Sequence, residues 1–286
     1  MQDWIYPYEV QKVVLSDTLE LAYIDEGQGE YSLLFLHGLG SYLKAWQQNI
    51  DGLSQQFRCI ALDLPGYGKS SQDDYAYDMK FFAQSVRAFI DSLALEKVIL
   101  VGHSMGGQVA VHSLLMDDSR IEKLVLIAPA GFETFSKSEK QWFQSLVTPE
   151  TVKATPEAQI IRNFEINFHQ MPKEARFMID DRLAMRETPA YDHYCAMIPK
   201  CVSGMLEQTV FDRLPEIKQP TLIIFGQNDL LIPNPFLHPN LTTESVARAG
   251  QRQIPGSQLM LLPNAGHFVQ WEQADRVNQL IMKFLQ

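Results

Sequence analysis

The segment from Val98 to Gly107 constrains the fold of this chain more than any other. Val98–Val101 is a run of four apolar residues that predicts a buried strand, and Gln108–Met116 is typical of a helix. Between them Ser104 lies in Gly-His-Ser-Met-Gly-Gly, with a glycine two positions before it and another two positions after it. Such glycines allow a sharp strand-to-helix turn that exposes the serine hydroxyl at the edge of a sheet. The alternative is an ordinary turn with a surface serine, but the strand before it and the helix after it favour a nucleophile.

Short apolar runs alternate with helix-like segments along much of the chain. The predicted strands are Val10–Leu15, Leu19–Asp25, Ser32–Leu36, Arg58–Leu62, Val98–Val101, Lys123–Ile127, Pro220–Gly226 and Gln258–Leu262. The predicted helices are Leu43–Leu53, Met79–Leu93, Gln108–Met116 and Gln273–Leu285. The first two strands form a hairpin. The later alternation predicts an α/β fold: a mostly parallel sheet with helices on both faces and right-handed crossovers.

The alternation stops after Gly131. Residues 132–211 contain helical stretches rich in aromatic residues and methionine, without a convincing strand. We therefore predict a core of residues 1–131 and 212–286, interrupted by a helical insert of residues 132–211. Because this insert is longer than an ordinary connection, we expect a lid over the site. A packing subdomain without a gating role is the alternative.

Composition limits the possible partners. The formal net charge is −10, with 24 Lys and Arg against 34 Asp and Glu, which disfavours binding to nucleic acid. The first residues lack the basic and apolar regions of an export signal, and no stretch approaches the roughly 20 apolar residues that span a bilayer. The three cysteines, an odd number without metal-like partners, indicate free thiols in a reducing compartment. We expect a cytoplasmic protein that does not bind membranes.

A serine nucleophile needs a base, and the base needs an orienting carboxylate. His267 follows the last predicted strand, and Asp229 follows the Pro220–Gly226 strand. Because the carboxyl ends of parallel strands meet at one edge of a sheet, both residues are expected to lie near Ser104. Their order along the chain, serine then acid then histidine, is that of one class of catalytic triad. Glu133 is the alternative acid.

Hydrolysis of a carbonyl compound also needs hydrogen-bond donors for the developing oxyanion. We expect these donors to be the backbone N–H groups of Leu39, in a glycine-rich turn, and Met105, after the nucleophile. His37 and His103 are expected to shape these turns rather than to accept protons. His103 and Phe268 are also candidates for substrate contact, since they flank the nucleophile and the base. The other histidines lack ligand-like spacing, so we predict no metal site.

Several of these motifs resemble those of a known family. They are His37-Gly38, Asp63–Ser70, Gly102–Gly107, Asp229 and Gly266-His267. In this order they resemble the α/β-hydrolase superfamily over almost the whole chain outside the insert. The resemblance implies an eight-stranded, mostly parallel sheet, a helical cap between strands six and seven, and hydrolysis through an acyl-enzyme. It implies only a structural role for Asp63 and Ser70.

Three branches of this superfamily come into question. Epoxide hydrolases and haloalkane dehalogenases use an aspartate where this chain has Ser104. The tail Gly266–Asp275 resembles that of the carbon–carbon hydrolases that act on meta-cleavage products of aromatic rings. Those enzymes usually carry asparagine before the nucleophile and a Gly-Pro-Gly turn, where this chain has His103 and Leu39-Gly40-Ser41. Carboxylesterases accommodate all of these residues.

Arg182 is a candidate substrate-binding residue in the insert. Ala175, Met178, Arg182 and Met185 share one face of a helix predicted over Lys173–Arg186. If this face lines the pocket, Arg182 would bind an acidic group of the substrate, as a cap arginine does in the ring-cleavage-product hydrolases. We expect the more common arrangement, in which the stem covers apolar surface and the head lies in water or pairs with an acid.

The proline-rich segment Ile232–Asn240 follows the candidate acid. Either it lines the pocket or, as we expect, it is a stiff surface loop. The sequence as a whole predicts a serine hydrolase for a small or medium carboxylic ester, with a small-molecule substrate and no cofactor. The alternatives are a carbon–carbon hydrolase for a dienone-type acid and a protein of this fold that binds a small molecule without turnover. The sequence does not predict an oligomeric state.

Overall fold

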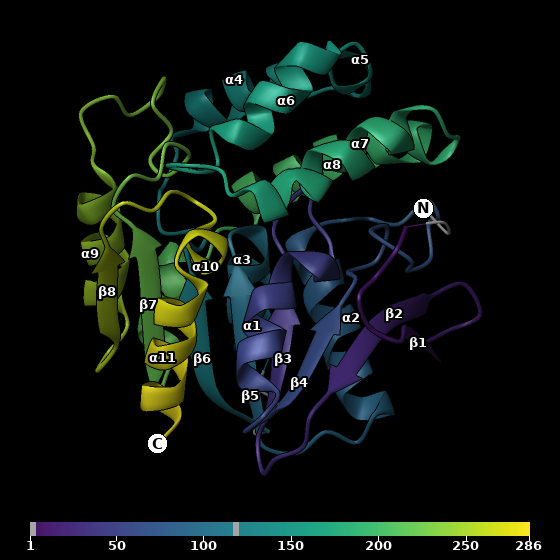
Figure 1. The fold of residues 1–286 in the computed structure, drawn as a ribbon. Coiled ribbons are helices and arrows are strands. Elements are labelled where there is room, and N and C mark those ends of the chain that lie inside the picture. The colour runs from purple at the N-terminus through teal and green to yellow at the C-terminus, as the bar shows by residue number, and fades with distance from the viewer. Residues whose placement is uncertain (1–3, 117–119) are drawn as a thin grey trace.

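The computed structural model describes residues 4–116 and 120–286, which contain one eight-stranded sheet (Figure 1). Its strands are β1 (Gln11–Val14), β2 (Glu20–Glu26), β3 (Ser32–Leu36), β4 (Arg58–Leu62), β5 (Val98–His103), β6 (Ile121–Ile127), β7 (Thr221–Gly226) and β8 (Gln258–Leu262). Their order in the sheet is β1-β2-β4-β3-β5-β6-β7-β8. β2 pairs antiparallel with β1 and with β4, and the remaining neighbours are parallel. The predicted mostly parallel sheet is thus confirmed.

The central strands are mostly apolar because both of their faces are buried. Alternate residues of β3 show this directly. Leu33 and Phe35 pack into one core cluster, whereas Leu34 and Leu36 pack into another on the opposite face, and all four are fully buried.

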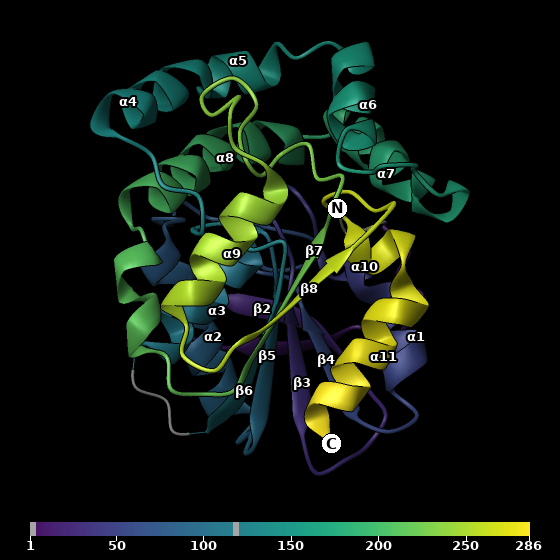
Figure 2. The same cartoon turned by 90° about the vertical axis from the view of Figure 1, so that its left-hand side faces the viewer.

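Helices cover both faces of the sheet, which Figure 2 shows edge-on between them. One face carries α1 (Gln47–Leu53), α10 (Val269–Glu272) and α11 (Ala274–Leu285), preceded by the 3₁₀ turn η1 (Leu43–Trp46). The other carries α2 (Met79–Ser92), α3 (Met105–Leu114) and α9 (Thr243–Gln253). In α2 the carboxylate of Asp78 caps the Phe81 N–H at 2.7 Å. Phe82, Val86 and Phe89 then recur at helical spacing and are buried.

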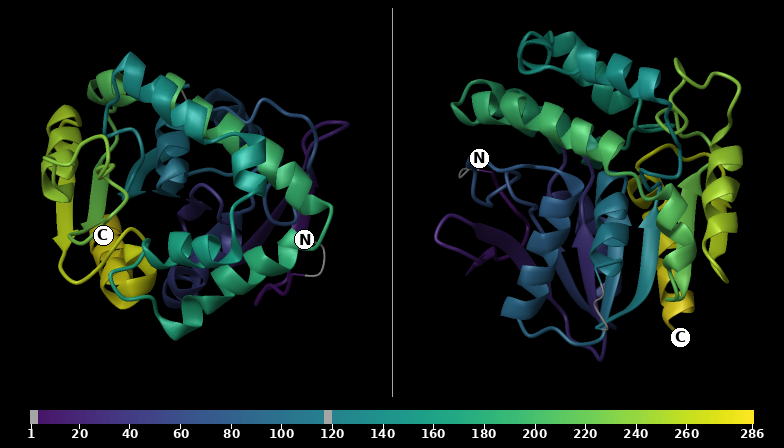
Figure 3. Two further views of the ribbon diagram at one scale, coloured as in Figure 1. Left: turned by 90° about the horizontal axis from the view of Figure 1, so that it is seen from above. Right: turned by 180° about the vertical axis from the view of Figure 1, so that it is seen from behind.

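Between β6 and β7 the chain forms the helical insert, which we define as α4 to α8. Its elements are α4 (Lys137–Leu146), α5 (Pro149–Lys153), α6 (Glu157–Glu165), η2 (Lys173–Arg176), α7 (Phe177–Arg186) and α8 (Ala190–Glu207), and η3 (Phe211–Glu216) follows. These helices lie above the carboxyl ends of the parallel strands (Figures 1 and 3). The helical stretch predicted over Lys173–Arg186 is confirmed, and its first turn is the 3₁₀ turn η2, which runs directly into α7.

Two other helices differ from expectation. α3 begins at Met105 rather than Gln108, because Ser104 is its N-cap and the glycines after it are already helical. α9 was not predicted. Within residues 4–116 and 120–286, none of the helices combines the length and the apolarity needed to cross a bilayer.

Candidate functional site

Ser104 occupies a strained turn between β5 and α3. Its φ and ψ angles are 52° and −120°, a conformation that side-chain-bearing residues rarely adopt and that often marks a functional position. Its N–H donates to the Ile127 carbonyl at 3.0 Å, and its carbonyl accepts from Ala130 N–H at 3.0 Å. A Cβ on Gly106 would lie 2.2 Å from the Leu36 carbonyl oxygen, so only glycine allows this close approach.

The loops after β7 and β8 bring Asp229 and His267 together. Backbone hydrogen bonds of 2.8 Å join the two loops, from Gln227 N–H to the Leu262 carbonyl and from Asn228 N–H to the Ala265 carbonyl. His267 Nδ1 lies 2.8 Å from Asp229 Oδ2, and both side chains are almost completely buried. The loops at two strand ends thus produce the expected acid–histidine pair.

The hydrogen bonds of Asp229 define the protonation pattern of His267. Asp229 Oδ1 accepts from the N–H groups of Leu231 and Ile232, at 2.8 and 3.1 Å, which leaves Oδ2 to accept from the imidazole. Because a carboxylate oxygen only accepts, Nδ1 of His267 carries the proton. Nε2 is then free to act as a base.

Ser104 and His267 line one cavity of about 440 Å³, within the range of small-molecule sites. The same cavity is lined by three other predicted residues, Leu39, His103 and Phe268. Apolar side chains from the helical insert and the loop after β7 form much of its wall, among them Phe143, Val202, Met205, Leu206, Leu230, Leu231 and Phe236. Ser104 is half-buried, whereas its neighbours His103 and Met105 are buried. Ser104 is therefore the most exposed of these three residues at the turn.

His37 and His103 are held by backbone groups. His37 Nδ1 donates to the Gly38 carbonyl at 2.9 Å, and its Nε2 accepts from Leu64 N–H at 3.1 Å, so it is neutral. Burial lowers the pKa of His37 to about 4. His103 Nε2 lies 3.0 Å from the His267 carbonyl oxygen, and burial lowers the pKa of His103 well below its usual value. Both rings are suited to fix turns rather than to accept protons.

The backbone N–H of Met105 is the first of α3 and has no carbonyl to bond within the helix. Its side chain is fully buried in the core, so its contribution to the site is confined to the backbone. Leu39 follows β3 and lines the cavity with Ser104. The structure therefore keeps both predicted oxyanion donors on segments adjacent to the serine.

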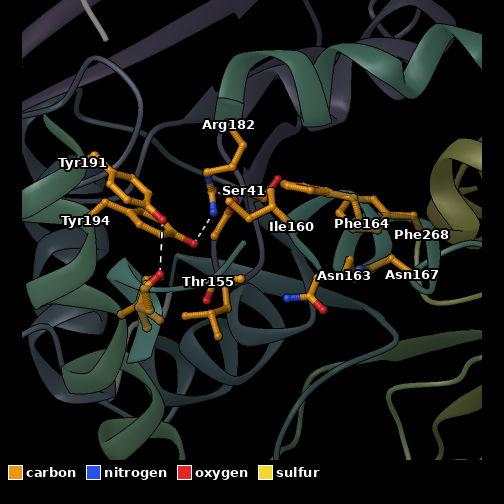
Figure 4. A pocket seen from close by; sticks show the side chains of 14 residues that line it. Ser41, Thr155, Ile160, Asn163, Phe164, Asn167, Arg182, Tyr191, Tyr194 and Phe268 are labelled. Atoms are coloured by element: carbon orange, nitrogen blue, oxygen red, sulfur yellow. Dashed lines mark hydrogen bonds between the residues drawn. The ribbon is translucent and has the colours of Figure 1, made fainter. Parts of the chain in front are cut away.

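Arg182 lines a second cavity, of about 250 Å³, shown in Figure 4. Leu39, Asn167 and Phe268 line both cavities, so the two adjoin. The Arg182 guanidinium donates to the Tyr194 hydroxyl and the Gly40 carbonyl and lies 3.9 Å from the centroid of the Tyr194 ring. The expectation of a head in water or paired with an acid is therefore wrong, because aromatic rings and a backbone carbonyl enclose it.

Glu133 pairs with His238 rather than His267. Glu133 Oε1 accepts from His238 Nδ1 and, at 2.8 Å, from the N–H of Asn234. Burial raises the pKa of Glu133. The alternative acid is thus engaged elsewhere.

This contact also holds the proline-rich segment against the chain. Ile232, Asn234, Pro235 and Phe236 of that segment line the cavity with Ser104. The segment therefore lines the cavity, which was the alternative to the expected surface loop, although Phe236 is largely exposed.

Gln108 lines the cavity but was not singled out from the sequence. Its position in the first turn of the helix that follows Ser104 was the available signal. The amide is 1% exposed, and its nitrogen bonds to two carbonyls of α8 and its C-cap.

The chain is similar to known proteins over most of its length. The family model described as alpha/beta hydrolase fold matches residues 31–274. A dihydrolipoyllysine-residue acetyltransferase component of the acetoin cleaving system from Pseudomonas putida is 30% identical over 91% of this chain, which spans 64% of that relative's length. A 2-hydroxy-6-oxononadienedioate/2-hydroxy-6-oxononatrienedioate hydrolase from Escherichia coli is 30% identical, with 94% of this chain and 91% of the relative covered.

Two solved structures are also similar. A probable hydrolytic enzyme from Pseudomonas aeruginosa PAO1 has a TM-score of 0.86 at 23% identity, covering 99% of this chain and 96% of the other. A thermophilic esterase from Thermogutta terrifontis has a TM-score of 0.76 at 27% identity, covering 97% of this chain and 98% of the other. With its eight-stranded sheet and a family match over most of its length, the chain belongs to the α/β-hydrolase fold family.

Proposed function

We propose that the chain hydrolyses small or medium carboxylic esters, with Ser104 as nucleophile, His267 as base and Asp229 as the orienting acid. The observation that carries this proposal is the 2.8 Å contact between Asp229 and His267, in a cavity that His267 shares with the strained Ser104. The similarity to an esterase supports the ester as substrate.

In this mechanism Nε2 of His267 takes the proton from the Ser104 hydroxyl as its oxygen attacks the ester carbonyl. Asp229 holds the proton on Nδ1 and stabilises the imidazolium that forms. The leaving alcohol then receives the proton from Nε2, which produces an acyl-enzyme. Water, activated by the same nitrogen, attacks the acyl group and releases the carboxylic acid and Ser104.

Backbone donors stabilise the oxyanion in both steps. The N–H groups of Leu39 and Met105 take this role, and each such donor is typically worth about 10²–10³ in rate. The apolar wall from the helical insert excludes water and receives the apolar part of the substrate. In this proposal residues 132–211 act as a lid, Phe268 contacts the substrate, and His103 fixes the loop that carries His267.

A kinetic comparison of two serine variants tests the proposal. We expect native protein to hydrolyse p-nitrophenyl butyrate and Ser104→Ala to lose on the order of 10⁴–10⁶ in kcat. Ser113→Ala is the matched control, because Ser113 lies on the same helix and its hydroxyl bonds back to the Val109 carbonyl at 2.9 Å. Similar losses in both variants would argue against the assigned nucleophile.

A second candidate activity is the cleavage of a carbon–carbon bond in an acidic dienone. The observation that favours it is the enclosed Arg182 guanidinium, which lines the second cavity. That cavity adjoins the one that Ser104 lines. The similar hydrolase from Escherichia coli is named for dioate substrates, which carry carboxylates. Assaying a ring-cleavage product beside the butyrate ester separates the two activities. Turnover of only the former would replace the ester proposal.

A further inference from the structure

The side chain of Gln108 lies where it could contact a polar group of a substrate. Gln108 lies in the first turn of α3, and its N–H donates to the Ser104 carbonyl at 3.3 Å. Both residues line the cavity of about 440 Å³. The Gln108 side chain is 1% exposed, so bulk water does not compete for its amide.

The orientation of the Gln108 amide is determined by its neighbours. Nε2 donates to the Met205 carbonyl at 3.0 Å and to the Gln208 carbonyl at 2.9 Å. These carbonyls belong to the end of α8 and its C-cap, where helices leave acceptors unpaired. Since both partners only accept, the amide nitrogen must face them, and Oε1 must face the other way.

Oε1 of Gln108 has no hydrogen-bond donor among residues 4–116 and 120–286. Asn49 and Gln270 also have buried, unpaired side-chain oxygens, but they do not line the cavity with Ser104. Gly131 lies next to the Gln108 amide, since a Cβ added at Gly131 would lie 3.5 Å from the amide carbon. A buried acceptor without a donor is unfavourable, and a ligand that supplies one removes this cost.

We propose that Oε1 of Gln108 determines specificity by accepting a hydrogen bond from a hydroxyl or amide N–H of the substrate. The proposal rests on the ester hydrolysis proposed above and narrows its substrate class. The preferred ester carries one such donor close to the scissile carbonyl, because Gln108 N–H bonds to the Ser104 carbonyl and both residues line the same cavity. The rest of the bound group is apolar, as the Val202, Met205 and Leu206 wall requires.

Matched ester pairs test this inference. The p-nitrophenyl ester of butyrate is compared with those of 2- and 3-hydroxybutyrate, and propyl butyrate with 3-hydroxypropyl butyrate. Each kcat/KM is divided by the rate of alkaline hydrolysis of the same ester, which removes intrinsic reactivity. In at least one pair we expect native protein to prefer the hydroxylated ester by roughly 10- to 100-fold.

Two variants distinguish a role of Gln108 in substrate recognition from a role in holding the end of α8. Gln108→Met keeps the length of the side chain and removes the acceptor, so the preference should disappear. His112→Phe is the control: His112 Nε2 bonds to the same Gln208 carbonyl at 2.8 Å, but His112 does not line the cavity. His112→Phe should change kcat/KM for both esters of a pair by the same factor, so the ratio of the two values should stay the same.

The possible failures are distinct. A preference below twofold in every pair, with ester hydrolysis that still requires Ser104, would overturn the role of Gln108 alone. The role of Gln108 would also be overturned if Gln108→Met lowered kcat/KM for both esters of the preferred pair by the same factor. An absence of turnover with every ester would remove the proposed function, and this inference with it.

Discussion

The guanidinium of Arg182 in α7 donates a hydrogen bond to the carbonyl oxygen of Gly40, in the turn after β3. The acidic neighbours of Arg182 pair elsewhere, Asp180 with Arg176 and Asp181 with Lys44. The charge of Arg182 is therefore directed to a backbone carbonyl. This contact joins the helical insert to the turn that carries the proposed oxyanion donor Leu39.

Replacing Arg182 should impair catalysis even on a neutral ester. In Arg182→Met the turn at Gly40 loses a charged donor, and such hydrogen bonds are worth about 1.5–3 kcal/mol. We expect kcat/KM for p-nitrophenyl butyrate to fall roughly 10-fold or more, mainly through kcat. Arg176→Met serves as control, since Arg176 is exposed and makes only a surface ion pair. Unchanged kinetics in Arg182→Met would show that the turn does not depend on this contact.

Gly40 should tolerate replacement by alanine less well than Gly256, a glycine with a similar φ angle. Gly40 has φ of +68°, and an added Cβ would lie 3.0 Å from the Tyr194 hydroxyl. Gly256 has φ of +70°, but nothing lies within 4 Å of its added Cβ. Both alanine variants carry the left-handed strain of about 1–2 kcal/mol. Denaturant unfolding should show a larger loss for Gly40→Ala, and only this variant should lose activity; equal losses would contradict a tight contact at Gly40.

The two acids after β7 and β6 should have separable roles. Asp229→Asn removes the acceptor that keeps the proton on His267 Nδ1, so kcat should fall on the order of 10⁴. Glu133→Gln weakens only the contacts of residue 133 with His238 and Asn234 of the proline-rich segment, so KM should rise with little change in kcat. Steady-state kinetics distinguish these effects. A larger loss of kcat in Glu133→Gln than in Asp229→Asn would exchange the two roles.

His37 should make the fold sensitive to acid. Burial lowers its pKa from 6.5 to about 4, so the unfolded chain binds this proton more readily than the folded one. The contribution of neutral His37 to the free energy of unfolding is fully present above pH 6.5. It is lost as the pH falls from 6.5 to 4, by about 3 kcal/mol at most. His37→Gln should be less stable at pH 7, and its deficit relative to native protein should shrink toward pH 4. A deficit independent of pH, measured by denaturant unfolding, would contradict this linkage.

Much of the sheet could be predicted from the sequence. β3, β4 and β8 have the predicted bounds, because each is a short apolar run that begins at a polar residue and is followed by a polar residue or proline. The contact between Asp229 and His267 was also predictable, since both follow parallel strands whose ends share one edge of the sheet.

The errors concern contacts between distant segments. The enclosure of Arg182 depends on Gly40 and Tyr194, which helical spacing within α7 does not specify. The pairing of Glu133 with His238 joins residues 105 positions apart. The unpaired oxygen of Gln108 becomes visible only once α8 occupies the amide nitrogen.

Covalent labelling tests the central claim most directly. Native protein is treated with a fluorophosphonate probe, which reacts with activated serine hydroxyls, and the modified peptide is identified by mass spectrometry. We expect one adduct, on Ser104, that is absent in Ser104→Ala and retained in Ser113→Ala. An unlabelled native protein, or an adduct on another serine, would contradict the assignment of Ser104 as the activated nucleophile.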